Sequence, residues 1–161
     1  MPPLSEKFTF SQRGGWWVVG QFFLLLLILL IPGPDFPPVI FSPVIFHLIG
    51  GIFIVTASLI LVSGAKSLRI ALTPFPYPME KVPLIQEGIY HFIRHPLYFG
   101  VILGGFGVSF WRMNGLAVGL SVGLTFFLNA KADQEEVWLL QKFPEYKAYR
   151  KNTKKLIPFL Y

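Results

Sequence analysis

The sequence predicts an all-α integral membrane protein with four transmembrane helices, the last two of which form a C-terminal helical hairpin followed by a cytoplasmic amphipathic tail helix. Of the 161 residues, 53% are hydrophobic and 14% are charged, whereas a soluble domain carries about 25% charged residues. The apolar residues also gather in long uncharged runs, and nearly all basic residues fall on one side of the topology that these runs imply. The length fits a single domain, 1–161.

Two uncharged runs open the chain, at residues 16–31 and 39–62. A run of about 20 apolar residues is long enough to span a bilayer. A buried core helix would need a large soluble body around it, and the composition leaves no residues for one. The first run is not expected to be a cleavable signal peptide, because no small-residue cleavage site follows it.

Two shorter apolar runs follow, at residues 97–111 and 116–130. The connection between them is so short that it predicts an antiparallel helical hairpin. About 15 residues of helix cover only about 22 Å, less than the hydrocarbon core of a bilayer, which is about 30 Å thick. Each helix must therefore include flanking residues, or the bilayer must become thinner around it. The tail predicts a helix from about Ala132 to Phe143 and a second, short helix from Pro144, lying on the membrane surface or packed on the hairpin.

The distribution of lysine and arginine predicts the orientation of these four spans. The N-terminal arm holds two basic residues, the 63–96 loop four and the tail from residue 129 seven, so that thirteen of the fourteen lie on one side. Only Arg112 lies on the other side, and the 32–43 loop has no base. The positive-inside rule then places both termini and the 63–96 loop in the cytoplasm.

The composition also excludes several kinds of site. With no cysteine, the chain has no disulfide framework, thiolate metal site or cysteine nucleophile. Three histidines without cysteine favour no metal site. The net charge of +6 fits a membrane protein with a basic cytoplasmic face better than a nucleic-acid partner. The proline-rich segment TPFPYP (73–78) is interpreted as a stiff, extended connector.

Most of the remaining polar groups are predicted to meet at the cytoplasmic end of the hairpin. Arg94, His95 and Pro96 begin the third span, and Pro96 leaves the next backbone N–H groups free to bind an anion. Glu135 and Glu136 leave the fourth span at the same depth, where paired carboxylates can hold an ammonium or two ribose hydroxyls. Simpler interpretations stay open: an arginine at the interface, a solvated glutamate face, and glycines 100, 104, 105 and 107 that permit close helix packing.

The segment GIYHFIRHPLYFG (88–100), followed by EEVWLLQKFPEYKAYRKNTKKLIPF (135–159), resembles the isoprenylcysteine carboxyl methyltransferases and the similar integral-membrane phospholipid methyltransferases. The shared pattern is Gly-x-Tyr, Arg-His-Pro-x-Tyr-x-Gly, a hydrophobic span, Glu-Glu and a Phe-x-x-Tyr-x-x-Tyr tail. The resemblance covers about residues 60–160, the expected cofactor-binding core.

The resemblance implies that S-adenosylmethionine binds at the cytoplasmic end of the hairpin, capped by the tail. Lys131 stands where the carboxyl methyltransferases place a substrate-contacting arginine, so it is implied to orient an anionic acceptor, and Arg94 to brace the cofactor site. The implied cofactor-binding residues are Val82, Pro83, Leu84, Ile85, Tyr90, His95, Pro96, Leu97, Tyr98, Glu135 and Glu136.

The sequence therefore predicts an enzyme that transfers a methyl group from S-adenosylmethionine to a lipophilic acceptor, such as a prenylcysteine-like carboxylate or thiolate, among membrane lipids. Methyl transfer from a sulfonium depends mainly on alignment, which suits a site that lacks an evident nucleophile–base pair. Two alternatives remain. Sterol reductases, which use NADPH, carry a similar Arg-His-Pro-x-Tyr segment, and a small non-catalytic membrane protein could hold the same polar groups for structural reasons.

Overall fold

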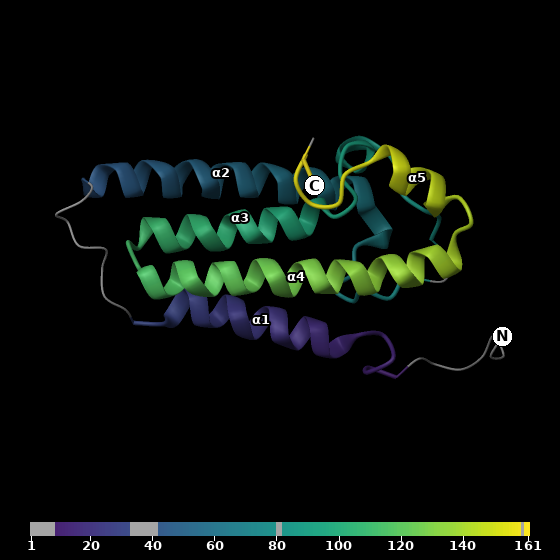
Figure 1. Ribbon diagram of the computed structural model, residues 1–161, viewed down its shortest axis with the longest axis horizontal. Helices are drawn as coiled ribbons and strands as arrows, with labels where there is room; N and C mark the ends of the chain where they lie inside the picture. Colours follow the sequence, from purple (N-terminus) through teal and green to yellow (C-terminus); the bar gives the residue numbers. More distant parts are fainter. Residues whose placement is uncertain (1–8, 33–41, 80–81, 159) are drawn as a thin grey trace.

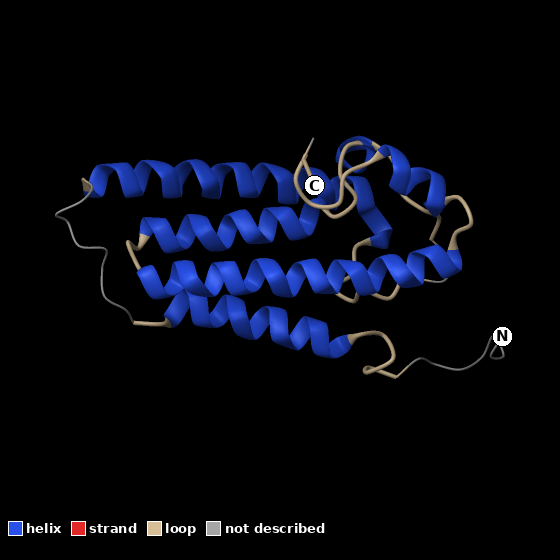
Figure 2. Cartoon of the chain, viewed as in Figure 1, coloured by secondary structure: helices blue, strands red, loops and turns tan. Residues whose placement is uncertain are grey.

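The computed structural model describes residues 9–32, 42–79, 82–158 and 160–161. Within them the chain is helical and has no β-strand (Figures 1 and 2). The predicted all-α fold class is confirmed. Most of the 32–43 loop, together with Lys7 and Lys81, lies outside the described residues. The helices are α1 (Gly15–Leu30), α2 (Pro43–Leu68), α3 (Pro96–Trp111), α4 (Gly115–Lys142) and α5 (Tyr146–Asn152), with 3₁₀ turns η1 (Arg69–Ala71) and η2 (Gly88–His91).

The helix α2 runs from Pro43 to Leu68 and so extends beyond the apolar run that ends at residue 62. Two boundaries predicted in the tail are wrong. The predicted separate tail helix from Ala132 does not exist, because α4 runs without a break from Gly115 to Lys142. No glycine or proline interrupts residues 124–143, so the change from apolar to polar composition does not end the helix. The short last helix is present but begins at Tyr146 instead of Pro144.

The four long helices lie side by side in the order α2, α3, α4, α1 (Figure 1). The predicted antiparallel hairpin is formed by α3 and α4, and the α3–α4 turn also binds the end of α1. The guanidinium of Arg112 donates to the carbonyls of Ile28 at 2.8 Å and Ile31 at 3.2 Å. The amide of Asn114 also donates to the Ile31 carbonyl, at 3.0 Å. These donors satisfy carbonyls that the end of a helix leaves free.

Much of the helical surface is apolar and exposed. Only 11% of the apolar stretch of α2 is buried, and α2 and α4 are both long and apolar enough to cross a membrane. A core helix of a soluble protein would be mostly buried, and exposed apolar patches of this extent mark contact with lipid or a partner. The helices α1 and α3 are apolar but shorter. The length, composition and exposure of α2 therefore favour a membrane protein.

Close backbone contact joins α2 to α3. A Cβ added at Gly50 would lie 2.6 Å from the Trp111 backbone nitrogen and 2.8 Å from the Gly107 carbonyl oxygen. A Cβ at Gly107 would lie 3.0 Å from the backbone nitrogen of Ile54. Gly107 therefore permits close packing, as predicted. A Cβ at Gly104 would meet only Ala57, at an ordinary 3.8 Å, so close packing does not require glycine there.

Gly50→Ala is expected to destabilise the fold by about 1–3 kcal/mol, because the added methyl group forces α2 away from α3. Gly51→Ala is the matched control, since a Cβ there would lie 3.4 Å from the Trp111 ring. The melting temperature in detergent measures both effects. Equal melting temperatures for the two variants would contradict the close contact at Gly50.

Candidate functional site

A cavity of about 730 Å³, including the space open to solvent at its mouth, lies at the end of the bundle where α3 begins. The chain between α2 and α3 supplies most of its wall, and the end of α2, the start of α3 and the C-terminal part of α4 with the residue after it supply the rest. Ten residues predicted from the sequence line it: Val82, Pro83, Leu84, Ile85, Tyr90, Arg94, His95, Leu97, Tyr98 and Glu135.

Three predicted site residues are not in this lining. Pro96 is fully buried at the start of α3 and packs toward Gly64 of α2. Glu136 is 3% exposed and is engaged in ion pairs. Lys131 is 1% exposed and lies among α1, Tyr98 and Pro74. The structure thus brings the segment 82–85, the Arg94–Tyr98 segment and Glu135 together, and leaves these three side chains behind the wall.

Part of the wall is not among the site residues predicted from the sequence. The proline-rich segment was interpreted as a connector, but Thr73 and residues 75–79 line the cavity. Neighbouring aromatic rings hold the segment in place: Phe75 meets Phe10 with ring centroids 5.9 Å apart, and Tyr77 meets Trp138 at 5.6 Å. The alternation of proline with aromatic residues was the available signal. Leu68, Ala71, Leu139 and Phe143 complete the lining.

One carboxylate faces the cavity from α4. The Tyr98 hydroxyl donates to Glu135 Oε2 at 2.6 Å, and the Tyr98 ring stacks on His95, with centroids 5.4 Å apart and planes within 1°. His95 Nδ1 lies 3.8 Å from the same oxygen. The Glu135 side chain keeps 25% of its surface exposed. Tyr98 therefore fixes the carboxylate while leaving it accessible from the cavity.

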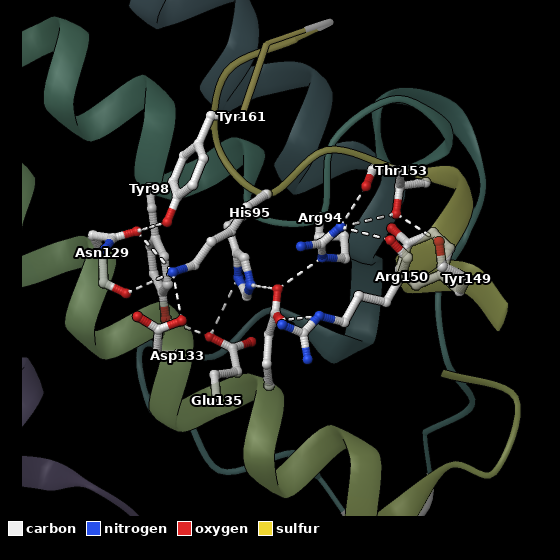
Figure 3. Close-up of polar contacts among 12 residues, drawn as sticks. Arg94, His95, Tyr98, Asn129, Asp133, Glu135, Tyr149, Arg150, Thr153 and Tyr161 are labelled. Atoms are coloured by element: carbon white, nitrogen blue, oxygen red, sulfur yellow. Dashed lines mark hydrogen bonds and ion pairs between the residues drawn. The ribbon is translucent and has the colours of Figure 1, made fainter. Parts of the chain in front are cut away.

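The neighbouring Glu136 is the centre of a buried ion cluster. Its partners Arg94, His95 and Arg150 are labelled in Figure 3. Its carboxylate accepts from Arg94 Nε at 2.7 Å, lies 3.3 Å from His95 Nε2, and pairs with Arg150 Nε at 3.1 Å. Arg94 Nη1 also donates to the carbonyls of Arg150 and Thr153. Arg150 and Thr153 belong to the C-terminal segment, which begins with α5. The cluster therefore joins this segment to the start of α3 and to α4.

Backbone hydrogen bonds and a second charged group strengthen this connection. The N–H groups of Arg94 and His95 donate to the carbonyls of Lys154 and Lys155, at 2.9 and 3.0 Å. The Lys155 ammonium, 6% exposed, binds Asn129 Oδ1 at 2.7 Å and Asp133 Oδ1 at 2.6 Å (Figure 3). The C-terminal segment therefore fixes the position of His95 through its backbone.

Three tyrosines surround this cluster. Burial, aided by the charge of Glu135, raises the pKa of Tyr90, a residue of the cavity lining, well above its usual range, so its hydroxyl stays protonated. The Tyr149 hydroxyl donates to the Tyr90 carbonyl at 2.6 Å. Burial raises the pKa of Tyr146 as well. Its hydroxyl is buried without a hydrogen-bond partner within the described chain.

A family model described as phospholipid methyltransferase matches residues 45–146, which is more than half of the chain. The chain belongs to the phospholipid methyltransferase family. The match runs from α2 to the first residue of α5 and so includes every residue that lines the cavity. This confirms the family resemblance predicted from the Arg-His-Pro-x-Tyr and Glu-Glu segments.

Curated relatives of this phospholipid methyltransferase family member carry two kinds of name. The chain is 36% identical over 84 residues to 3-oxo-5-alpha-steroid 4-dehydrogenase 1 of Macaca fascicularis. It is 33% identical over 84 residues to the Homo sapiens protein of the same name. Each of these two matches covers 50% of this chain and 29% of the relative. The chain is 32% identical over 77 residues to protein-S-isoprenylcysteine O-methyltransferase of Dictyostelium discoideum, covering 47% of this chain and 32% of that protein. The chain thus matches about a third of the length of each of these relatives.

Within the described residues, no group of three or more histidine, cysteine or acidic side chains lies close enough to hold a metal ion. The cavity combines an apolar and aromatic wall with the partly exposed carboxylate of Glu135 and with several other polar side chains: Thr73, Tyr77, Tyr90, Arg94, His95 and Tyr98. Such a site can bind an organic molecule that has an apolar or aromatic body and a few hydrogen-bond donors.

Proposed function

We propose that this protein transfers the methyl group of S-adenosylmethionine to a lipophilic acceptor at the cytoplasmic face of a membrane. The observation that carries the proposal is the cavity, whose wall combines the Arg94–Tyr98 segment with Glu135 of α4. Membership of the phospholipid methyltransferase family supports the reaction class. The isoprenylcysteine O-methyltransferase relative supports an acceptor that carries an apolar chain.

The residues present fit S-adenosylmethionine. Its ammonium and ribose hydroxyls are donors, and Glu135 is an acceptor that Tyr98 holds from one side only. Tyr90 adds a hydroxyl at the wall, and the side chains from Val82 to Ile85 and from Phe75 to Pro78 offer apolar and aromatic surface. When bound, the cofactor supplies a methyl group on a positively charged sulfur. Glu135 and Tyr90 would hold it, while the apolar wall would exclude water.

Alignment is the main contribution that these residues make to the reaction. A displacement at a methyl group needs the acceptor atom in line with the bond that breaks, and holding two reactants in this arrangement removes much of the barrier. His95 and Tyr98 hold Glu135, and the C-terminal segment holds His95 through backbone hydrogen bonds. Arg94, which the sequence analysis assigned a bracing role, would keep that segment in place through Glu136 and Thr153.

The proposed acceptor is a carboxylate or thiolate on a prenylcysteine-like molecule, as the name of the Dictyostelium relative suggests. A methyl-transfer assay on membranes with prenylcysteine acids, prenylated thiols and aminolipids tests this. If only an aminolipid is methylated, the proposed acceptor class is wrong but methyl transfer as the reaction is supported. Lys131 was predicted to orient the acceptor, but it lies outside the cavity lining.

We further propose that α1 to α4 all span the membrane, with both termini cytoplasmic. The thirteen-to-one distribution of basic residues supports this orientation. In α4 the span would end near Lys131, and the rest of the helix would extend into the cytoplasm to carry Glu135 and Glu136. The cavity would then open at the cytoplasmic face, where a soluble cofactor and a membrane-bound acceptor can meet.

The orientation can be tested with single cysteines, because the chain has none of its own. Ser42→Cys, at the exposed N-cap of α2, is expected to react with a membrane-impermeant maleimide in intact cells. Asn152→Cys, at the exposed end of α5, is expected to react only after lysis. Labelling of residue 152 in sealed cells would overturn the proposed orientation.

An NADPH-dependent reductase is the second candidate, favoured by the two steroid dehydrogenase relatives. S-adenosylhomocysteine and NADPH, added separately to the protein in detergent, distinguish the candidates through the melting temperature. A ligand at 100 times its Kd stabilises the folded state by about 2.7 kcal/mol, so a rise with S-adenosylhomocysteine alone is expected. A rise with NADPH alone would favour the reductase, and no rise with either would favour a non-catalytic protein.

A further inference from the structure

The ammonium of Lys131 is buried at the junction of three helices and the cavity wall. Lys131 is 1% exposed. Its Nζ donates to Gln21 Oε1 of α1 at 2.8 Å and to the Pro74 carbonyl at 3.2 Å. It also lies 4.9 Å from the centroid of the Tyr98 ring, within the range of a cation–π interaction. A lysine ammonium has three N–H donors, so these contacts leave little capacity for another partner.

Two of the three contacts of Lys131, those with Pro74 and Tyr98, lead to different parts of the cavity. Pro74 lies between Thr73 and Phe75, which line it. Tyr98 lines it too, and its hydroxyl donates to Glu135. Glu135 is four residues after Lys131 on α4, so the two side chains lie on one face of the helix. Lys131 therefore contacts the Pro74 carbonyl of the proline-rich wall and the ring of Tyr98, which binds Glu135, from outside the cavity.

We propose that Lys131 is a positioning residue, which fixes the 73–79 wall and Tyr98 relative to α4 and does not contact the methyl acceptor. Burying an ammonium is costly unless it is paired, and here the pairing groups are an amide, a carbonyl and a ring. Replacing Lys131 with an apolar side chain removes the cost of burying the charge but leaves Gln21 and the Pro74 carbonyl without this donor. The main consequence of removing the ammonium is then a less ordered wall.

A reporter in the wall tests this without any ligand. Thr73→Cys, in a chain that otherwise has no cysteine, is expected to react slowly with a charged maleimide. Adding Lys131→Met, which keeps the apolar stem, is expected to raise the labelling rate severalfold. In the same variant, calorimetry with S-adenosylhomocysteine is expected to show roughly a tenfold higher Kd, because binding must then order the wall. Only this second readout rests on the proposed function.

Arg112→Met is the matched control. Arg112 also donates to carbonyls of α1, but at the opposite end of the helix. If Lys131 acts only by holding α1 on the bundle, the two variants should have the same labelling rate and Kd. The positioning role instead predicts that Arg112→Met changes neither. Gln21→Leu removes one partner of Lys131 and provides a milder test should Lys131→Met fail to fold.

An unchanged labelling rate in both Lys131→Met and Gln21→Leu would overturn the proposal, whatever the ligand does. An unchanged Kd for S-adenosylhomocysteine despite faster labelling would overturn it as well, because the wall would then not matter for binding. The unsubstituted protein could also fail to bind S-adenosylhomocysteine while Lys131→Met still raises the labelling rate. That result would support the role of Lys131 in ordering the wall and would overturn only the proposed function.

Discussion

Glu136→Ala is expected to destabilise the protein by about 3–5 kcal/mol, the cost of leaving buried charges without their partner. Arg94 and His95 are nearly buried and both meet this carboxylate, at 2.7 and 3.3 Å. Its removal also releases Arg150 and weakens the attachment of the C-terminal segment. In a chain of this size the loss corresponds to a melting temperature lower by on the order of 10 °C.

Glu145→Ala is the control for Glu136→Ala, because it removes the same charge from an exposed position just before α5. Its melting temperature is expected to stay within about 2 °C of the unsubstituted protein. The double variant Arg94→Ala/Glu136→Ala should lose less than the sum of the single losses, because the two residues share one interaction. Additive losses would show that the ion pair does not hold the C-terminal segment.

Glu135→Gln is expected to raise the Kd for S-adenosylhomocysteine about 10- to 100-fold, with the melting temperature of the free protein nearly unchanged. One charged hydrogen bond contributes about 1.5–3 kcal/mol. Glu135 faces the cavity and is partly exposed, and a glutamine oxygen can still accept from Tyr98. His95→Ala is expected to weaken binding through the loss of the ring that stacks on Tyr98.

Substitutions of the two adjacent glutamates are thus expected to have opposite effects on ligand affinity and on stability. Glu135→Gln changes affinity and spares stability, whereas Glu136→Ala chiefly changes stability. Isothermal calorimetry and thermal melting on the same preparations measure both quantities. Unchanged affinity in both Glu135→Gln and His95→Ala would mean that the cavity does not bind the cofactor through these groups.

Local signals were sufficient to predict much of the fold. Pro96 begins α3, and the few residues between Trp111 and Gly115 form the predicted hairpin turn. The helix boundary predicted near Ala132 was wrong because a change in polarity marks a change of surroundings, not an end of helix propensity. The residues that begin the polar part of α4 are good helix formers.

Features that depend on distant partners could not be predicted in this way. Lys131 lies one helical turn before Glu135 on α4, but its contact with Gln21 follows only from the position of α1 against α4. Arg112 was interpreted only as a charge on the far side, while the structure shows it binding the carbonyl end of α1. The wall at 73–79 depends on rings that belong to other segments, such as Trp138.

The family resemblance, more than the chemistry of the residues, predicted which segments line the cavity. Nothing in the composition of the segment from Val82 to Ile85 marks it as part of a site, yet it lines the same cavity as Glu135. Glu136, by contrast, was grouped with Glu135 because the two are neighbours in sequence. Successive residues on a helix point in different directions, so one carboxylate faces the cavity and the other faces Arg94.

Photoaffinity labelling tests most directly whether S-adenosylmethionine binds in this cavity. A photoreactive analogue of S-adenosylhomocysteine, irradiated with the protein in detergent and mapped by mass spectrometry, is expected to modify residues within 71–79 and 82–98. Excess S-adenosylhomocysteine should abolish this modification, and excess NADPH should leave it unchanged. Modification confined to segments away from the cavity, such as 116–128, or displaced by NADPH instead, would contradict the proposed cofactor site.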